Sequence, residues 1–184
     1  MSEENNEAID KYKKLKKEIK VTLIEVLIAA IIGICVSRFV ITNTEVPSGS
    51  MIPTIEEHAM LFSYRLAYTF SNPERFDIVV FRHPDGDEKL LIKRVIGLPG
   101  ETIKCENGHI YVDDKLLVED NYLSDNVYTS DFGPYDIPDN CYFMLGDNRT
   151  NSLDARYWNN KFVNIDDIIG KALFEYEPEF KKLY

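Results

Sequence analysis

Residues 90–100 read LLIKRVIGLPG, and this stretch decides the fold class. A short run rich in Leu, Ile and Val that ends in a Gly-Leu-Pro-Gly turn is typical of a buried β-strand. Similar apolar runs lie at residues 76–81 (FDIVVF), 109–112, 116–118, 141–145 and 168–174. Turn residues separate these runs, and no long apolar helical pattern follows residue 43. We therefore expect a mainly β domain built on antiparallel sheet.

Clusters of Gly, Pro, Asn and Asp mark the expected turns. They lie at residues 84–87, 98–100, 106–108, 133–134 and 146–148. Asn107-Gly108 is the strongest hairpin signal, because both residue types tolerate the positive φ angles that a two-residue hairpin turn requires. The apolar residues 60–62 and 66–70 are expected in the core, with burial in a membrane interface as the alternative.

Composition excludes several function classes. The 184 residues include 31 acidic and 21 basic side chains, which give a net charge of −10 and disfavour binding to a phosphate backbone. Three scattered histidines suggest neither a zinc site nor a Ser-His-Asp triad, and we expect no metal and no cofactor. Three cysteines are too few for a disulfide framework, and one bridge between Cys105 and Cys141 stays open.

The amino-terminal part has the pattern of a membrane anchor. Six lysines within residues 11–20 precede the apolar residues 21–42, which would span about 33 Å as a helix, close to a bilayer core of about 30 Å. The positive-inside rule places residues 1–20 in the cytoplasm and residues 43–184 outside. Glu25 and Arg38 shorten the uncharged stretch, so a buried core helix and a cleaved signal peptide are the alternatives.

Polar chemistry concentrates in three segments that lie far apart in the sequence. Residues 46–55 (VPSGSMIPTI) place two serines and a glycine between two prolines, residues 90–100 put a lysine in an apolar strand, and residues 144–158 (MLGDNRTNSLDARYW) alternate carboxylates with guanidiniums. Taken singly, they have ordinary interpretations as a rigid linker, a strand with a solvent-facing lysine and a charged loop.

The first two segments together suggest a mechanism. A serine hydroxyl needs a base, and a neutral lysine amine serves if its pKa falls from ~10.4 toward the working pH. Burial among aliphatic side chains lowers a lysine pKa by ~2–3 units, and the neighbours of Lys93 are aliphatic.

Four motifs in order resemble those of the bacterial type I signal peptidases, of the small single-anchor kind found in Gram-positive bacteria. Residues 47–54 resemble the family's nucleophile box, residues 75–81 its strand box and residues 93–100 its lysine box. Residues 146–149, followed by 156–158, resemble its last box. The resemblance runs from the end of the apolar stretch almost to the carboxyl terminus.

The resemblance implies a role for each matching residue. Ser50 would be the nucleophile and Lys93 the general base, while the Ser48 hydroxyl and the Ser50 N–H would form the oxyanion hole. Ser152 would orient the Lys93 amine. The residues expected to hold the site rigid are Asp147, Arg149, Asp154 and Arg156.

The family resemblance also implies a fold and a substrate. The fold would be a β-sheet protease core from residues 44–100 and 140–184, preceded by one transmembrane helix, with an insertion at about 101–139. The substrate would be the signal peptide of an exported preprotein, bound as an extended strand with small residues one and three positions before the cut. The rival interpretation is a catalytically inactive, membrane-tethered β module that acts as a scaffold or binds a partner.

Three positions depart from the family pattern. Thr150 stands where Asp is usual, Asn159 where Gly commonly follows the Tyr-Trp pair, and Glu101 where Asp often follows the Leu-Pro-Gly turn. None of the three is the expected nucleophile or base, so the departures concern only the contacts that support the site.

Overall fold

The computed structural model describes residues 2–86, 89–123 and 127–183, and the chain divides into two compact units, Met1–Val40 and Ile41–Tyr184. The first unit is α1 (Ser2–Cys35), continued by the short π-helical segment Val36–Val40. Within the described residues, one helix is long and apolar enough to cross a membrane, and it covers Lys13–Val40. Residues 41–42, which the sequence assigns to the anchor, belong instead to the first strand of the second unit.

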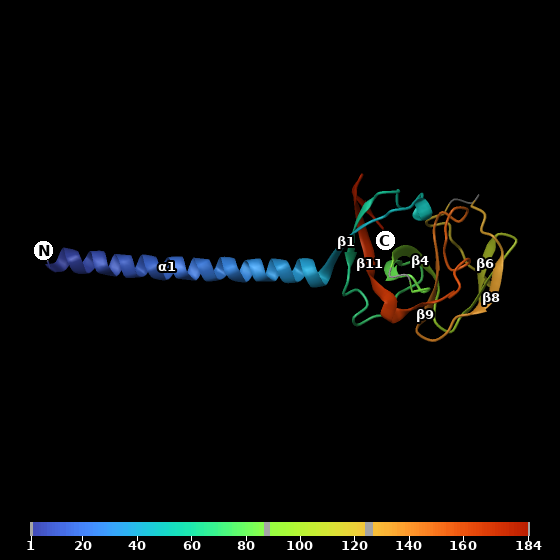
Figure 1. Cartoon of the computed structure of the whole chain (residues 1–184), viewed down its shortest axis with the longest axis horizontal. Helices are drawn as coiled ribbons and strands as arrows, with labels where there is room; N and C mark the ends of the chain where they lie inside the picture. Colours follow the sequence, from blue (N-terminus) through green and yellow to red (C-terminus); the bar gives the residue numbers. More distant parts are fainter. Residues whose placement is uncertain (1, 87–88, 124–126, 184) are drawn as a thin grey trace. The chain divides into compact units, whose positions relative to one another are not determined.

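The second unit is made of antiparallel strands, as predicted (Figure 1). In its described part, the larger sheet has the order β1-β2-β11-β3-β4-β9-β10, with β12 paired to β11. These strands are β1 (Ile41–Glu45), β2 (Met60–Tyr64), β3 (Ile78–Arg82), β4 (Leu90–Gly97), β9 (Cys141–Leu145), β10 (Val163–Asn164), β11 (Ile168–Glu177) and β12 (Lys181–Lys182). Two 3₁₀ turns, Gly49–Met51 and Ile165–Asp167, accompany them.

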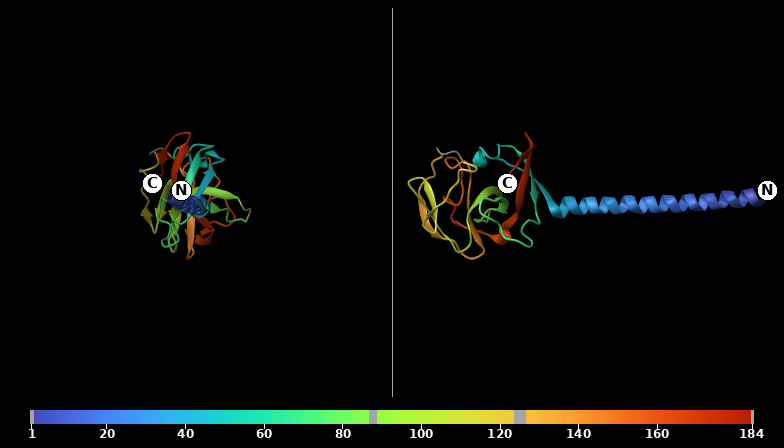
Figure 2. Two further views of the ribbon diagram at one scale, coloured as in Figure 1. Left: turned by 90° about the vertical axis from the view of Figure 1, so that its left-hand side faces the viewer. Right: turned by 180° about the vertical axis from the view of Figure 1, so that it is seen from behind.

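The smaller sheet comes entirely from the stretch in which an insertion is expected. Its described strands follow the order β7-β6-β5-β8. They are β5 (Thr102–Glu106), β6 (His109–Val112), β7 (Lys115–Leu116) and β8 (Phe132–Asp136). The view from behind shows these yellow strands at the end of the domain opposite the red carboxyl-terminal strands (Figure 2).

The predicted hairpin is present at Asn107-Gly108. Both residues have positive φ, 53° and 81°, and they join β5 to β6 in register. This backbone is that of the two-residue turn that follows the twist of a sheet. The turn predicted at 84–87 is partly described, since residues 84–86 form a turn and Asp87 lies outside the described residues.

The turn predicted at residues 133–134 is wrong. Gly133 and Pro134 lie inside β8, which is the last strand of the smaller sheet and is paired only with β5. An edge strand tolerates proline because one row of its backbone groups needs no partner. Gly133 adopts a φ of 83° opposite a register shift between Ile103 and Cys105, so the glycine marks a bulge and not a reversal of the chain.

Two apolar clusters form the core, one on each side of the central strands. The smaller cluster lies beneath the segment that carries Ser48 and Ser50, and it includes Met51, Ile55, Leu61 and Ile92. The prediction that residues 60–62 and 66–70 are core is therefore only half right. Leu61 is fully buried, whereas Phe70 is 99% exposed on a loop.

The cysteines are free. Cys105 is buried and its thiol donates to the carbonyl of Thr129 at 3.5 Å, while Cys141 is half-buried on β9. The bridge that the sequence left open is thus not formed.

Candidate active site

A 3₁₀ turn carries Ser50 and is anchored on both sides. Met51 and Ile55 are completely buried below the turn. From the loop after β9, the Asn148 backbone N–H donates to the Ser50 carbonyl at 3.0 Å, and the Asn148 side chain donates to the Gly49 carbonyl at 2.9 Å. These contacts fix the backbone of the turn, so the position of the Ser50 hydroxyl is set before any ligand arrives.

Lys93 lies on β4, a strand paired on both sides, and only 3% of the residue is exposed. Its Nζ is 2.5 Å from Ser50 Oγ, although 43 positions separate the two residues in the sequence. Burial lowers the pKa of Lys93 from 10.5 to about 8, while the nearby Asp154 and Asp147 carboxylates oppose this shift. An amine with this pKa is neutral in a large fraction of molecules near pH 8, and a neutral amine can accept the serine proton.

Ser48 lies beside the Ser50 hydroxyl. Its Oγ donates to Ser50 Oγ at 3.3 Å and makes no capping hydrogen bond to the 3₁₀ turn. The hydroxyl is therefore available to a group that approaches Ser50 from solvent.

Ser152 is buried at the site, but it does not make the expected hydrogen bond to Lys93. Among the described residues its Oγ has no hydrogen-bond partner, because the Lys93 amine points at Ser50. Ser152 packs against Gly146 so closely that a Cβ on Gly146 would collide with Ser152 Oγ and with the Ser50 carbonyl. Only glycine fits at position 146.

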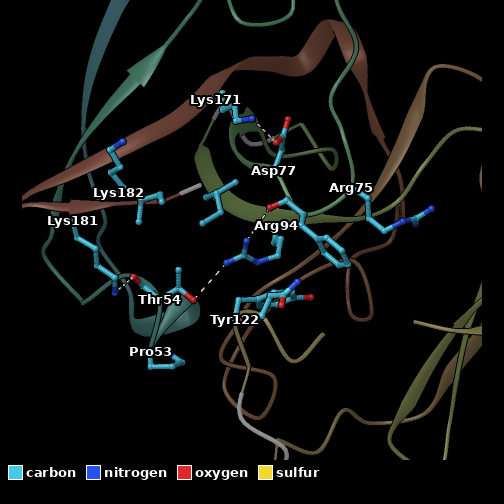
Figure 3. Close-up of a pocket in the computed structure, with 13 residues that line it drawn as sticks. Pro53, Thr54, Arg75, Asp77, Arg94, Tyr122, Lys171, Lys181 and Lys182 are labelled. Atoms are coloured by element: carbon cyan, nitrogen blue, oxygen red, sulfur yellow. Dashed lines mark hydrogen bonds and ion pairs between the residues drawn. The ribbon is translucent and has the colours of Figure 1, made fainter. Parts of the chain in front are cut away.

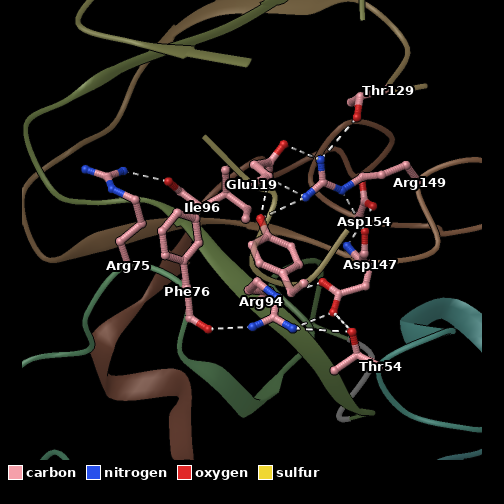
Figure 4. A network of polar contacts seen from close by, with 12 residues as sticks. Thr54, Arg75, Phe76, Arg94, Ile96, Glu119, Thr129, Asp147, Arg149 and Asp154 are labelled. Carbon is pink, nitrogen blue, oxygen red and sulfur yellow. Dashed lines mark hydrogen bonds and ion pairs between the residues drawn. The ribbon is translucent and has the colours of Figure 1, made fainter. Parts of the chain in front are cut away.

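Two buried ion pairs lie near Lys93, Arg94 with Asp147 and Arg156 with Asp154, and Figure 4 shows the first of them. Asp147 accepts two bonds from Arg94, at 2.8 and 2.5 Å, and one from the Thr54 hydroxyl. Asp154 accepts two bonds from Arg156, at 2.8 and 2.9 Å, and one from the Gly146 N–H at 3.0 Å. Paired two-point contacts of this kind fix both partners in orientation as well as in position.

Arg149 supports the same loop from the other side. Its Nε donates to the Gly146 carbonyl at 3.0 Å, and its two terminal nitrogens donate to Glu119 at 2.9 and 2.6 Å. The bond to Glu119 raises the pKa of Arg149 despite its burial, so the guanidinium is always charged.

The sequence predicts four of the supporting residues but not the others. Arg94 and Asn148 lie within the matching motifs, yet the sequence indicates no role for either. The presence of Arg94 in an apolar strand is itself a signal, because a buried guanidinium needs a carboxylate partner. Glu119 and Tyr122 gave no signal, since acidic and aromatic residues in a polar loop are ordinary.

The three departures from the family pattern have partners of their own. Glu101 accepts two bonds from Arg75, at 3.0 and 2.5 Å, and one from the Leu98 N–H. The Asn159 backbone donates to Asp85 at 3.0 Å, and the Thr150 hydroxyl donates to Asn148 at 3.4 Å. None of these contacts touches Ser50 or Lys93.

A pocket of about 510 Å³ lies beside Pro53 and Thr54, which follow the 3₁₀ turn that carries Ser50 (Figure 3). Its walls include Thr54, Arg94, Tyr122 and Lys171. Lys171 in its wall pairs with Asp77 at 2.6 Å, and Lys181 Nζ donates to the Thr54 carbonyl at 2.7 Å. The contact from Lys181 thus helps to fix the segment that follows the turn with Ser50.

Comparison with known proteins gives consistent matches. The family model described as "Signal peptidase, peptidase S26" matches residues 19–177. The chain is 36% identical over 155 residues to a probable signal peptidase I-2 of Synechocystis sp., covering 82% of this chain and 69% of the relative. It is 40% identical over 153 residues to a signal peptidase I of Bacillus caldolyticus, covering 76% and 81%. A crystal structure of a signal peptidase I from Enterococcus faecalis is 34% identical, with a TM-score of 0.46, and covers 55% of this chain and 97% of that one.

Proposed function

The chain belongs to the signal peptidase family S26, and from this membership we propose that Ser50 and Lys93 are its catalytic nucleophile and general base. The protein is a serine endopeptidase that removes amino-terminal signal peptides. One observation carries the assignment of roles: a buried lysine amine lies 2.5 Å from a serine hydroxyl.

In the proposed mechanism the neutral Lys93 amine takes the Ser50 proton as Oγ attacks the scissile carbonyl. The oxyanion that forms accepts hydrogen bonds from the Ser50 N–H and the Ser48 hydroxyl. The Lys93 ammonium then protonates the leaving amine, which departs as the new amino terminus of the mature protein. In the second half of the reaction, Lys93 takes a proton from a water molecule as the water oxygen attacks the acyl carbon. The bond between this carbon and Ser50 Oγ then breaks, Ser50 Oγ takes the proton back from the Lys93 ammonium, and the signal peptide leaves with a new carboxyl terminus.

The remaining site residues act by support. Asp147 and Asp154, each paired with an arginine, hold the loop after β9 against the nucleophile turn. We propose that Ser152 orients the Lys93 amine once Ser50 has been acylated, because the amine then loses Ser50 Oγ as its partner. The buried Ser152 hydroxyl, which has no hydrogen-bond partner among the described residues, is ready for that bond.

The substrate and location follow from the same proposal. The signal peptide binds as an extended strand, with small residues one and three positions before the cut, so that backbone hydrogen bonds supply affinity for varied sequences. The helix over Lys13–Val40 anchors the protein in the cell membrane, with its lysine-rich end in the cytoplasm and residues 43–184 outside. Tethering raises the local concentration of membrane-bound substrates.

The inactive scaffold gains no support from the site. Burial of Lys93 works against the folded state, because a lysine is more easily accommodated in water. A protein that only bound a partner would gain nothing from keeping this amine beside a serine.

The test uses the full chain in detergent with a preprotein substrate. We expect the wild type to cut, and Ser50→Ala and Lys93→Met to lose at least a thousandfold in kcat while remaining folded. Ser71→Ala and Lys115→Met are matched controls at exposed positions, and they should cut like the wild type. Substantial activity in either dyad variant would refute the roles assigned here.

A further inference from the structure

We propose that Glu119 and Tyr122, on the segment between β7 and β8, are positioning residues for the Ser50–Lys93 dyad. The inference rests on the proposed function and extends it to the insertion. By this account the smaller sheet is part of the catalytic apparatus, since the segment that leaves it completes the support of the active site.

Glu119 is the counterion of Arg149. The Arg149 side chain is fully buried, and that of Glu119 is 15% exposed. The carboxylate receives both terminal nitrogens of the guanidinium, at 2.9 and 2.6 Å, and it also accepts the Tyr122 hydroxyl. Thr129, from the same segment, accepts a further bond from Arg149 at 3.1 Å. Residues of the insertion therefore supply most of the partners of this arginine.

Arg149 passes this restraint to the dyad. Its Nε donates to the Gly146 carbonyl at 3.0 Å, and Gly146 packs directly against the Ser50 carbonyl. Gly146 also follows β9, the strand paired with the Lys93 strand β4. A shift of the Arg149 guanidinium would thus move the backbone that contacts the nucleophile.

Tyr122 makes the second connection. The Arg94 guanidinium lies 4.0 Å from the centre of the Tyr122 ring (Figure 3). The same guanidinium forms the two-point pair with Asp147 (Figure 4). A cation over an aromatic face is attracted by the ring, which covers the guanidinium and shields it from water. The tyrosine hydroxyl meanwhile accepts a bond from Arg149 at 3.3 Å, so one side chain holds both arginines.

The charges around Lys93 give the proposal a distinctive signature. Two carboxylates, Asp147 and Asp154, face the amine and are paired with Arg94 and Arg156. Arg149, on the loop after β9, is a third cation that acts on Asp147, and its counterion is Glu119. Removing the Glu119 charge leaves Arg149 uncompensated, which disfavours the Lys93 ammonium. The acid limb of the activity profile should then move to lower pH.

The experiment compares Glu119→Gln and Glu119→Asp with Glu106→Gln in the full chain in detergent. Glu106 lies on the same insertion, 61% exposed and paired with Lys104, so its variant removes the same charge away from the site. For Glu119→Gln we expect kcat to fall about tenfold with KM changed less than twofold, because the reacting groups are misplaced. Its acid limb should move down by roughly one half to one pH unit. Glu119→Asp keeps the charge, so its limb should stay where it is in the wild type.

A structural role alone would give a different result. In that case Glu119→Gln would lower the melting temperature but keep the wild-type kcat per active site and the wild-type limb, which would overturn the proposal. If Glu119→Gln does not fold, Tyr122→Leu decides, since it removes the ring over Arg94 without changing a charge. We expect a loss of at least fivefold in kcat, and a kcat equal to the wild type would overturn the proposal. Ser50→Ala in the same assay tests the proposed function separately.

Discussion

Lowering the pH should switch the protein off by protonating Lys93. With a pKa of about 8, the amine is neutral in about 90% of molecules at pH 9, about 9% at pH 7 and about 1% at pH 6. Only the neutral amine can accept the Ser50 proton. We therefore expect kcat/KM to fall about tenfold for each pH unit below pH 7, and about ninetyfold in total between pH 9 and pH 6.

The size of this effect follows from the surroundings of the amine. The pKa falls from 10.5 to about 8, which corresponds to about 3 kcal/mol of lost preference for the ammonium form. Burial causes the shift, and Asp154 and Asp147 limit it. A bound substrate removes the remaining water from the amine, so the limb seen in kcat should lie at or below the limb seen in kcat/KM.

The assay measures cleavage of an internally quenched signal-sequence peptide from pH 5 to 10 by the full chain in detergent. Trp158 lies in the core, and its fluorescence reports whether the domain stays folded at each pH. A rate that stays flat from pH 5 to pH 9 on folded protein would refute the assignment of Lys93 as the base. A limb centred above pH 10 would refute the claim that burial has lowered its pKa.

Three further predictions concern single side chains. Lys93→Met should raise the free energy of unfolding by up to about 3 kcal/mol below pH 8, because the lysine is protonated there in both the folded and the unfolded state and the burial penalty is complete. This gain should vanish as the pH rises through 10.5. A gain that does not depend on pH in urea titrations would contradict the prediction. Asp154→Asn leaves the buried Arg156 without its carboxylate, so it should cost about 3–5 kcal/mol and lower the melting temperature by about 10 °C, whereas a shift under 2 °C in scanning calorimetry would count against a structural ion pair. Ser152→Ala removes a buried hydroxyl that has no hydrogen-bond partner in the described part of the chain, so stability should be unchanged or up to about 1 kcal/mol higher while kcat falls at least tenfold; an unchanged kcat would remove Ser152 from the mechanism.

β4, β6 and β9 lie within one residue of the predicted apolar runs. In β4 and β9, Val, Ile, Leu and Phe concentrate because these central strands are covered on both faces, whereas the buried residues of β6 alternate with more exposed ones. The first strand, β1, escapes prediction because its sequence ITNTE has one apolar residue and lies at the edge of its sheet. Its pairing with β2 depends on tertiary packing, which no local pattern contains.

The residues of the candidate active site, like the strands, could be predicted only in part. Ser50 and Lys93 could be named because their motifs resemble those of a known family, and the burial of Lys93 follows from its aliphatic neighbours. Of the two contacts expected for the Lys93 amine, the one with Ser50 is present, whereas Ser152 has no hydrogen-bond partner among the described residues. The role of Glu119 could not be predicted from the sequence, because it depends on an ion pair with the buried Arg149, 30 positions away.

Because Cys105 and Cys141 are free thiols, the protein should tolerate reducing conditions during purification. No disulfide between these two thiols supports the β domain, so dithiothreitol should leave it folded.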